Sequence, residues 1–415
     1  MKSSTSSRPA EDVGRFCMSL ARALCMYGTP TPRLERSIEE VAAKLAIPCQ
    51  ILATPTGIQA SFGEGADQRT YLERVQPGQI HLARLSETAA VHDQVMHGHL
   101  GPEEGTYKLQ RIAASHPPWS GPVTALSFSL TSAAASVFLG GGILEIIAAG
   151  IVGLIIGLLA VLLAGRRRVQ GLFEFLAALS ASSCSVLLAA MLPGLVPHVP
   201  TLAGLIVLIP GLTLTIAMSE LSRQHLVSGT ARLMGAAVLF LLIGMGVVIG
   251  GELQSLVPIH PRAQIEALPF WATWVALPVA ATTFMVLFQA RKQDWLPILI
   301  AGFLAIYGTR LGNQFDIPRT GITLGVGTGA FLVGLLGNLR FRLRGQPPEV
   351  TDLPGILLIV PGSLGYKSLH HLLERETLLG LNTAFAMTTT AVTLVIGLLL
   401  ANLVIPPQRK VTESP

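Results

Sequence analysis

The sequence predicts an all-α polytopic membrane protein in which ten transmembrane helices, arranged as two inverted five-helix repeats, follow a small α+β cytosolic domain. Three observations support this fold class. Half of the 415 residues are hydrophobic and only 13% are charged, whereas soluble domains carry about 25% charged residues. Long apolar stretches fill the chain after residue 119. Two of these stretches match each other when the sequence is shifted by 151 residues.

The N-terminal part has the composition of a soluble domain. We expect a disordered N-terminus over 1–10 and an α+β domain over 11–119. Apolar residues at helical spacing predict two helices, separated by turn residues at Tyr27-Gly28. Apolar runs bounded by turn residues then predict three strands, at Cys49–Ala53, Ile58–Phe62 and Ile80–Leu85. Helices are expected again over Ser86–His99 and Glu103–Ser115.

Ten charge-free apolar stretches predict membrane spans, because a helix needs about 20 such residues to cross the hydrocarbon core. The first five form a repeat over 120–265 and the second five a repeat over 266–406, with a cytosolic tail over 407–415. The stretches are 122–144, 146–165, 175–197, 199–219, 233–251, 267–290, 295–309, 320–339, 353–366 and 377–408.

Lysine and arginine in the short loops predict the orientation, because cytoplasmic loops are enriched in these residues. With the N-terminus inside, the inner loops hold twelve of them and the outer loops five. Both termini are therefore expected in the cytoplasm. The first twelve residues lack the apolar core of a signal peptide. The four cysteines form no C-x-x-C pair and are expected to be reduced thiols.

The repeat carries a structural consequence. Residues 202–211 (LAGLIVLIPG) align without a gap on 353–362 (LPGILLIVPG). Each half holds five spans, and an odd number turns the second copy upside down, as in many secondary transporters. Proline and glycine open a helix backbone, which lipid tolerates only where that backbone is buried or lines a cavity. We expect Pro210, Gly211, Pro361 and Gly362 to line a substrate path, with a kink that only shapes packing as the alternative.

Polar residues inside the spans supply further candidates. Glu145 follows three consecutive glycines between two spans. An intramembrane carboxyl group is costly enough to indicate ion or proton handling, with a hydrated interface position as the alternative. Glu174 and Glu220 are expected at hydrated interfaces. Asn382 is a candidate contact to a solute, because an amide both donates and accepts hydrogen bonds.

Other chemistries find little support. No Walker A motif and no G-x-S-x-G nucleophile elbow is present. His92, His97 and His99 do not have the usual spacing of zinc ligands, so a hydrated helix end is the main interpretation and a metal site the alternative. The basic residues suit membrane orientation rather than nucleic-acid binding. We therefore expect no enzyme activity, no cofactor, no metal and no nucleic-acid partner.

Two motifs resemble the threonine/serine exporter family, including its split two-subunit relatives. These motifs are Gly140-Gly-Gly-Ile-Leu-Glu145 and Ile359-Val-Pro-Gly-Ser-Leu-Gly-Tyr366, set in a chain that begins with an α+β domain. By position, Glu145 matches the family's acidic residue, which is more often Asp, and becomes the proton-coupling candidate. Pro361, Gly362 and Tyr366 match the motif of the second half.

The resemblance implies a secondary transporter that exports threonine and serine across the bacterial cytoplasmic (inner) membrane. Protons and the lipid bilayer would be its partners, the proton-motive force would drive it, and a homo-oligomer is an open option. Split relatives imply small dicarboxylates such as succinate as an alternative substrate. A membrane-anchored hydrolase with its catalytic site in 11–119 is a second alternative.

Overall fold

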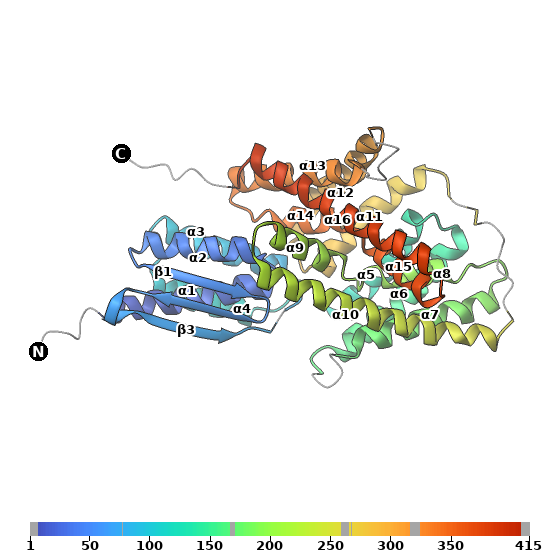
Figure 1. Cartoon of the computed structure of the whole chain (residues 1–415), viewed down its shortest axis with the longest axis horizontal. Helices are drawn as coiled ribbons and strands as arrows, with labels where there is room; N and C mark the ends of the chain where they lie inside the picture. The colour runs from blue at the N-terminus through green and yellow to red at the C-terminus, as the bar shows by residue number, and fades with distance from the viewer. Residues whose placement is uncertain are drawn as a thin grey trace, which may run out of the picture.

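The computed structural model describes residues 7–76, 78–166, 171–258, 265–266, 268–315 and 324–407. The N-terminal domain forms one end of the long axis and a bundle of helices forms the rest (Figure 1). The predictions made for residues 1–6 and 408–415 lie outside the described residues, as do several of the loop charges used for orientation. Those charges are Arg167, Arg168, Arg262, Arg319, Arg409 and Lys410.

The N-terminal domain packs helices on one face of a small antiparallel sheet of order β1-β2-β3. Its register pairs Ile51 with Ala60 and Ala60 with Tyr71. Phe16, Ile38 and Ile58 are fully buried between the helices and the sheet, so the core follows the apolar positions expected from the sequence. The elements are α1 (Ser7–Tyr27), α2 (Thr31–Lys44), β1 (Cys49–Thr54), β2 (Gly57–Phe62), η1 (Gly65–Asp67), β3 (Arg69–Arg74), α3 (Leu82–Met96) and α4 (Pro102–Ala114).

Two predictions for this domain are wrong. Residues 7–10 belong to helix α1 rather than to a disordered terminus. The predicted strand Ile80–Leu85 is largely the start of helix α3, because Leu82 and Leu85 bury one face at helical spacing. The third strand is β3, an edge strand with little apolar pattern; its Leu72 is 81% exposed.

Twelve α-helices follow in the described part of the chain. Seven helical segments are long and apolar enough to cross a membrane, those containing α5, α6, α7, α10, α12, α13 and α16, and α11 is a shorter apolar helix. The helices are α5 (Gly121–Phe138), α6 (Ile143–Leu163), α7 (Phe173–Met191), α8 (His198–Leu205), α9 (Gly211–Ser222), α10 (Leu226–Gly251), α11 (Trp271–Leu287), α12 (Trp295–Asn313), α13 (Leu324–Arg344), α14 (Glu349–Leu357), α15 (Gly362–Leu373) and α16 (Thr377–Val404), with 3-10 turns η2 (Glu252–Ser255) and η3 (Lys292–Asp294).

Two of the ten predicted spans are each divided into two short helices. The stretch 199–219 corresponds to α8 and α9, and 353–366 corresponds to α14 and the start of α15. The divisions fall directly before Gly211 and Gly362, where Pro210 (φ −77°, ψ 42°) and Pro361 (φ −78°, ψ 30°) leave helical geometry. Proline removes a helix donor and clashes with the preceding turn, which explains both breaks.

The element starts of the two halves keep the register of the sequence repeat. The starts of α8 and α14 (198 and 349), α9 and α15 (211 and 362), and α10 and α16 (226 and 377) are each 151 residues apart. Gln224 (φ 67°) and Arg375 (φ 66°), also 151 residues apart, share an unusual left-handed backbone in the turns after α9 and α15. The segments from α8 to α10 and from α14 to α16 therefore fold alike.

Equivalent helices begin at different ends of the bundle. Helix α14 starts at the N-terminal domain, where Arg33 pairs with Glu349. Helix α8 instead starts at His198, which interacts electrostatically with Lys367 and His370 of α15. Helix α9, which follows α8, reaches the N-terminal domain only at its end, where Glu220 contacts Thr31.

The N-terminal domain also docks on the end of α11, in the second half. The first backbone N–H groups of α3 donate to the end of α11, from Leu82 to Phe288 O at 2.9 Å and from Ala83 to Gln289 O at 3.0 Å. The Trp119 indole donates to Ala290 O at 2.9 Å. Terminal amides and carbonyls of two helices thus satisfy each other, and the two parts share one continuous apolar core.

Candidate functional site

The two Pro-Gly breaks meet each other inside the bundle. A Cβ atom placed on Gly211 would lie 2.8 Å from Val360 Cγ1 and 3.1 Å from the Cα of Gly362. A Cβ on Gly362 would lie 2.8 Å from Ile209 Cγ2. Any larger residue would therefore push the two broken helices apart. The structure brings together Pro210, Gly211, Pro361 and Gly362, the four residues expected at the path, and we call this contact the crossing.

A cavity of about 470 Å³ lies between the crossing and the N-terminal domain. Helices α2 and α3 line one side, and α9, α13, α14 and α16 line the other. Its inner end reaches Leu212 and Ile356, close to the two breaks. The charged and polar lining residues include Arg33, Arg36, Glu40, His92, Asp93, Thr215, Arg223, Asn338, Glu349, Asp352 and Asn402.

Asp352 lies in this cavity and was absent from the predicted site. Its carboxylate rests against α13, where Oδ1 is 2.2 Å from the position that a Cβ on Gly337 would take. The Thr351 hydroxyl approaches Oδ1 at 3.5 Å, and no ion pair to Asp352 is seen among the described residues. The sequence signal existed, because Glu349 and Asp352 directly precede the ninth apolar stretch. Because the ninth span was predicted to begin after the last charged residue, both acids were left out of the predicted site.

The neighbouring acid is already paired. Glu349 accepts from the Arg33 guanidinium of α2, and that guanidinium also lies over the ring of Phe341 at 5.2 Å. Nearby, the Asn338 amide donates to Asn402 Oδ1 at 2.8 Å. The N-terminal domain thus supplies a cation to the mouth of the cavity, while Asn338 and Asn402 join α13 to α16.

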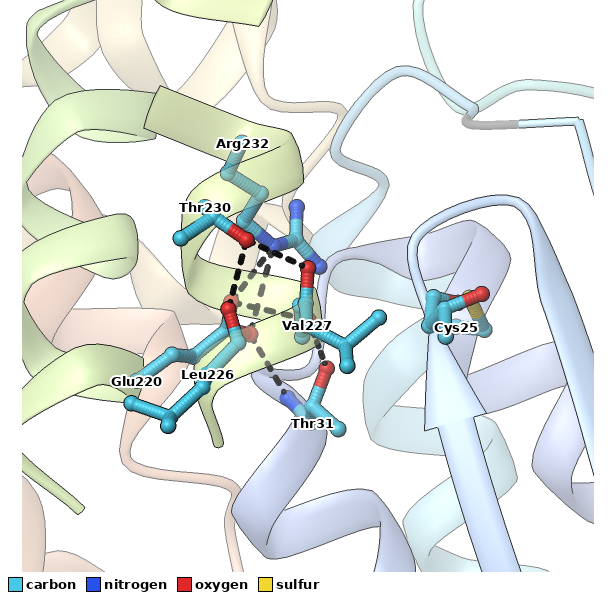
Figure 2. Close-up of polar contacts among 9 residues, drawn as sticks. Cys25, Thr31, Glu220, Leu226, Val227, Thr230 and Arg232 are labelled. Carbon is cyan, nitrogen blue, oxygen red and sulfur yellow. Dashed lines mark hydrogen bonds and ion pairs between the residues drawn. The ribbon is translucent and has the colours of Figure 1, made fainter. Parts of the chain in front are cut away.

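The sequence predicted that Glu220 lies at a hydrated interface, and this prediction is wrong. The side chain is fully buried, with 0% exposure. Its carboxylate accepts from Arg232 Nε at 3.1 and 3.2 Å, from the Thr31 backbone N–H at 3.1 Å and from the Ser228 hydroxyl at 2.9 Å (Figure 2). Thr31 is the first residue of α2, where a negative charge is favourable. The domain therefore attaches to α9 and α10 through one satisfied carboxylate.

Glu145 lies away from the cavity and caps helix α6. It is 4% exposed, and its oxygens accept from the backbone N–H groups of Gly142 at 2.9 Å and Val196 at 3.3 Å. The preceding glycines have a packing reason as well. A Cβ on Gly141 would lie 2.3 Å from Ser136 Oγ, and one on Gly142 would lie 2.9 Å from the backbone oxygen of Glu266. Glu145 thus caps α6 through Gly142 and holds the loop before α8 through Val196.

The other two predicted site residues are not at the crossing. Tyr366 lies one turn beyond Gly362 on α15, is buried in an apolar cluster with helices of the first half, and stacks on His370 with 6.1 Å between ring centroids. Asn382 lies on the exposed surface of α16 and does not line the cavity.

The N-terminal domain has little that favours nucleophilic or metal chemistry. Burial raises the pKa of the Cys17 thiol to about 12 and that of Cys49 to about 11, whereas a nucleophilic thiol needs a lowered pKa. His97 and His99 are exposed and stack on each other, while burial lowers the pKa of His92. Among the described residues, the three histidines do not form a group that could share a metal ion.

A helical bundle with two broken helices that meet at the end of a cavity is typical of membrane transporters. Comparison with known families agrees. Two threonine/serine exporter family models match, one over residues 15–254 and a second, described as "Threonine/Serine exporter, ThrE", over residues 273–404. The chain belongs to the threonine/serine exporter family. This family consists of membrane exporters and not of enzymes. The family match therefore argues against a membrane-anchored hydrolase.

Curated relatives are fungal membrane proteins. The chain is 29% identical over 388 residues to the pheromone-regulated membrane protein 10 of Candida albicans, covering 90% of this chain and 34% of that protein. It is 26% identical to the proteins of that name in Eremothecium gossypii and Saccharomyces cerevisiae, covering 85% and 91% of this chain and 48% and 50% of theirs. The chain thus spans about half or less of these relatives. No solved structure matches.

Proposed function

We propose that this protein is a secondary transporter that exports threonine and serine from the cytoplasm, driven by the proton-motive force. The observation that carries the proposal is the crossing at the inner end of the cavity. Broken helices leave backbone groups free, and in lipid such groups are tolerated where they are buried or line a cavity. Paired interruptions at equivalent positions of two halves are the usual location of a transporter's substrate site.

We further propose that the bundle crosses the membrane ten times, as two inverted five-helix repeats. In this arrangement α8 and α9 together form one membrane span, and α14 and α15 together form another. Two findings support it: the common 151-residue offset of the element starts, and the opposite ends at which α8 and α14 begin. With both termini in the cytoplasm of a bacterial cell, the cavity would open to the cytoplasm beside the N-terminal domain.

The charges of the cavity favour an amino acid over a dicarboxylate. Its lining holds both signs, with four acids (Glu40, Asp93, Glu349 and Asp352) and three arginines (Arg33, Arg36 and Arg223). A zwitterion needs one cation and one anion, whereas succinate would meet a surplus of carboxylates. The buried Nε of Arg223 has no hydrogen-bond partner among the described residues. It is therefore the best placed donor for the substrate carboxylate.

The proposal is tested by feeding cells a threonine- or serine-containing dipeptide with and without the protein. Expression should lower the intracellular threonine and serine concentrations several-fold and raise those outside, and a protonophore should abolish the difference. Arg223→Lys, which keeps the charge and loses the planar donor, should weaken export. If intracellular threonine and serine concentrations are equal with and without the protein, and succinate is exported, the substrate is the dicarboxylate and not the amino acid.

A further inference from the structure

We propose that Asp352 is the carboxylate for which a proton and the ammonium group of the exported amino acid compete, so that one proton enters for each amino acid released. This inference rests on the proposed transport function and gives it a coupling residue. It also moves the proton site from Glu145, the candidate predicted from the sequence, into the cavity.

The position of Asp352 fits a ligand-binding carboxylate. It lies on α14 one turn deeper than Glu349, between the cavity mouth and the crossing. Gly337 lets the carboxylate lie against the backbone of α13, since a Cβ there would be 2.2 Å from Oδ1. The carboxyl group of Asp352 therefore packs against the α13 backbone, and a larger residue at position 337 would displace it.

The charged groups around Asp352 form ion pairs with other residues and none with Asp352 in the described part of the chain. Those that act on it are Glu349 on its own helix, Arg33 from α2 and Arg340 from α13. Arg33 pairs with Glu349. Arg340 donates to Asp294 Oδ1 at 3.4 Å through Nη2, while its buried Nε and Nη1 have no hydrogen-bond partner among the described residues. Among the described residues, Asp352 receives only the long 3.5 Å contact from Thr351. The carboxyl group of Asp352 thus faces the cavity without an ion pair among the described residues.

A carboxylate in a site of low dielectric needs one positive charge, and either an ammonium group or a proton supplies it. With the amino acid bound, the ammonium group pairs with ionised Asp352. When a proton arrives, it binds an Asp352 oxygen and the ammonium group leaves with its charge unchanged. The charges balance on both sides of this exchange, because one proton replaces one ammonium at a single carboxylate.

The test uses the full-length protein in proteoliposomes and measures labelled threonine exchange as a function of pH. For the wild type, the half-saturating threonine concentration should rise about tenfold for each pH unit below the carboxylate's pKa, as competition with protons requires. Asp352→Asn should lose this dependence and gradient-driven accumulation, and Asp352→Glu should keep both. Glu174→Gln is the control, because Glu174 is an acid in the first turn of α7 outside the cavity.

If Asp352→Asn shows no flux, a second measurement tests the inference through binding instead of transport. Adding threonine to weakly buffered detergent-solubilised protein should release a proton from the wild type and from Asp352→Glu, but not from Asp352→Asn. Proton release by Asp352→Asn, or retained pH dependence in its exchange, would overturn the inference. If the wild type neither moves nor binds threonine and serine, the proposed function itself fails, which is a separate result.

Discussion

At the scale of single residues, Glu220, Glu145 and Asp352 differ in what surrounds them. Glu220 has a guanidinium, a hydroxyl and a backbone amide, and Glu145 has two backbone amides. Asp352 has only a distant hydroxyl and faces a cavity. An acid whose lone pairs are already satisfied stabilises the fold, whereas an unpaired one is available to a ligand.

Substituting Glu145 should affect stability more than coupling. Glu145→Ala removes the acceptor for the Gly142 and Val196 N–H groups, so we expect a loss of about 1–2 kcal/mol, typical of a helix cap. Melting of the detergent-solubilised protein measures this loss. Threonine exchange by the folded variant should keep its pH dependence. A stable variant without that dependence would return the coupling function to Glu145.

A histidine of the N-terminal domain should make stability depend on pH. Burial and the nearby Arg84 lower the pKa of His81 to about 4, against about 6.5 in an unfolded chain. Between these values only the unfolded chain binds the proton, so stability falls as the pH falls from 6.5 towards 4. His81 Nδ1 accepts from the Arg84 backbone N–H at 3.3 Å, and His81→Asn keeps an acceptor there. The melting temperature of this variant should fall less between pH 7 and pH 5 than that of the wild type.

Exposed His99 provides the control for this experiment. His99→Asn should melt like the wild type at both pH values. An equal fall in melting temperature for His81→Asn and the wild type would show that His81 does not titrate in this way.

At the scale of elements, the broken helices depend on glycine at the crossing. Gly211→Ala or Gly362→Ala would place a Cβ 2.8 Å from Val360 or Ile209, so the helices must separate, at a cost of about 1–3 kcal/mol typical of overpacking. We expect each variant to lose at least tenfold in threonine export. Gly235→Ala on α10 is the matched control, because nothing lies within 4 Å of its added Cβ.

Export measured in cells, with membrane abundance quantified for each variant, checks this prediction. Gly235→Ala should export like the wild type. Wild-type export by both crossing variants would mean that the two breaks do not lie on the path.

At the scale of the whole molecule, the two helix breaks were the part of the fold most readily predicted. The Pro-Gly match at an offset of 151 residues located both breaks, because helix interruption is a local property of the backbone. The burial of Glu220 could not be predicted in this way, since its Thr31 partner is 189 residues away. Asp352 was missed for a related reason. Whether an acid beside an apolar stretch is hydrated or faces a cavity depends on the helices packed around it.

The inverted arrangement predicts opposite exposure of two equivalent positions. Ser222 and Leu373 end helices α9 and α15, lie 151 residues apart and are both exposed. In a variant without the four native cysteines, Ser222→Cys should react with a membrane-impermeant maleimide only from the cytoplasmic side. Leu373→Cys should react only from the outside. Labelling of both from one side would contradict the inverted repeat.

The most direct test of the account is threonine flux in proteoliposomes that contain the purified full-length protein and an imposed pH gradient. We expect threonine and serine to accumulate on the side of higher proton concentration, to equilibrate when a protonophore is added, and to exceed succinate transport by at least tenfold. Threonine and serine fluxes equal to those of empty liposomes under every gradient would contradict the central claim.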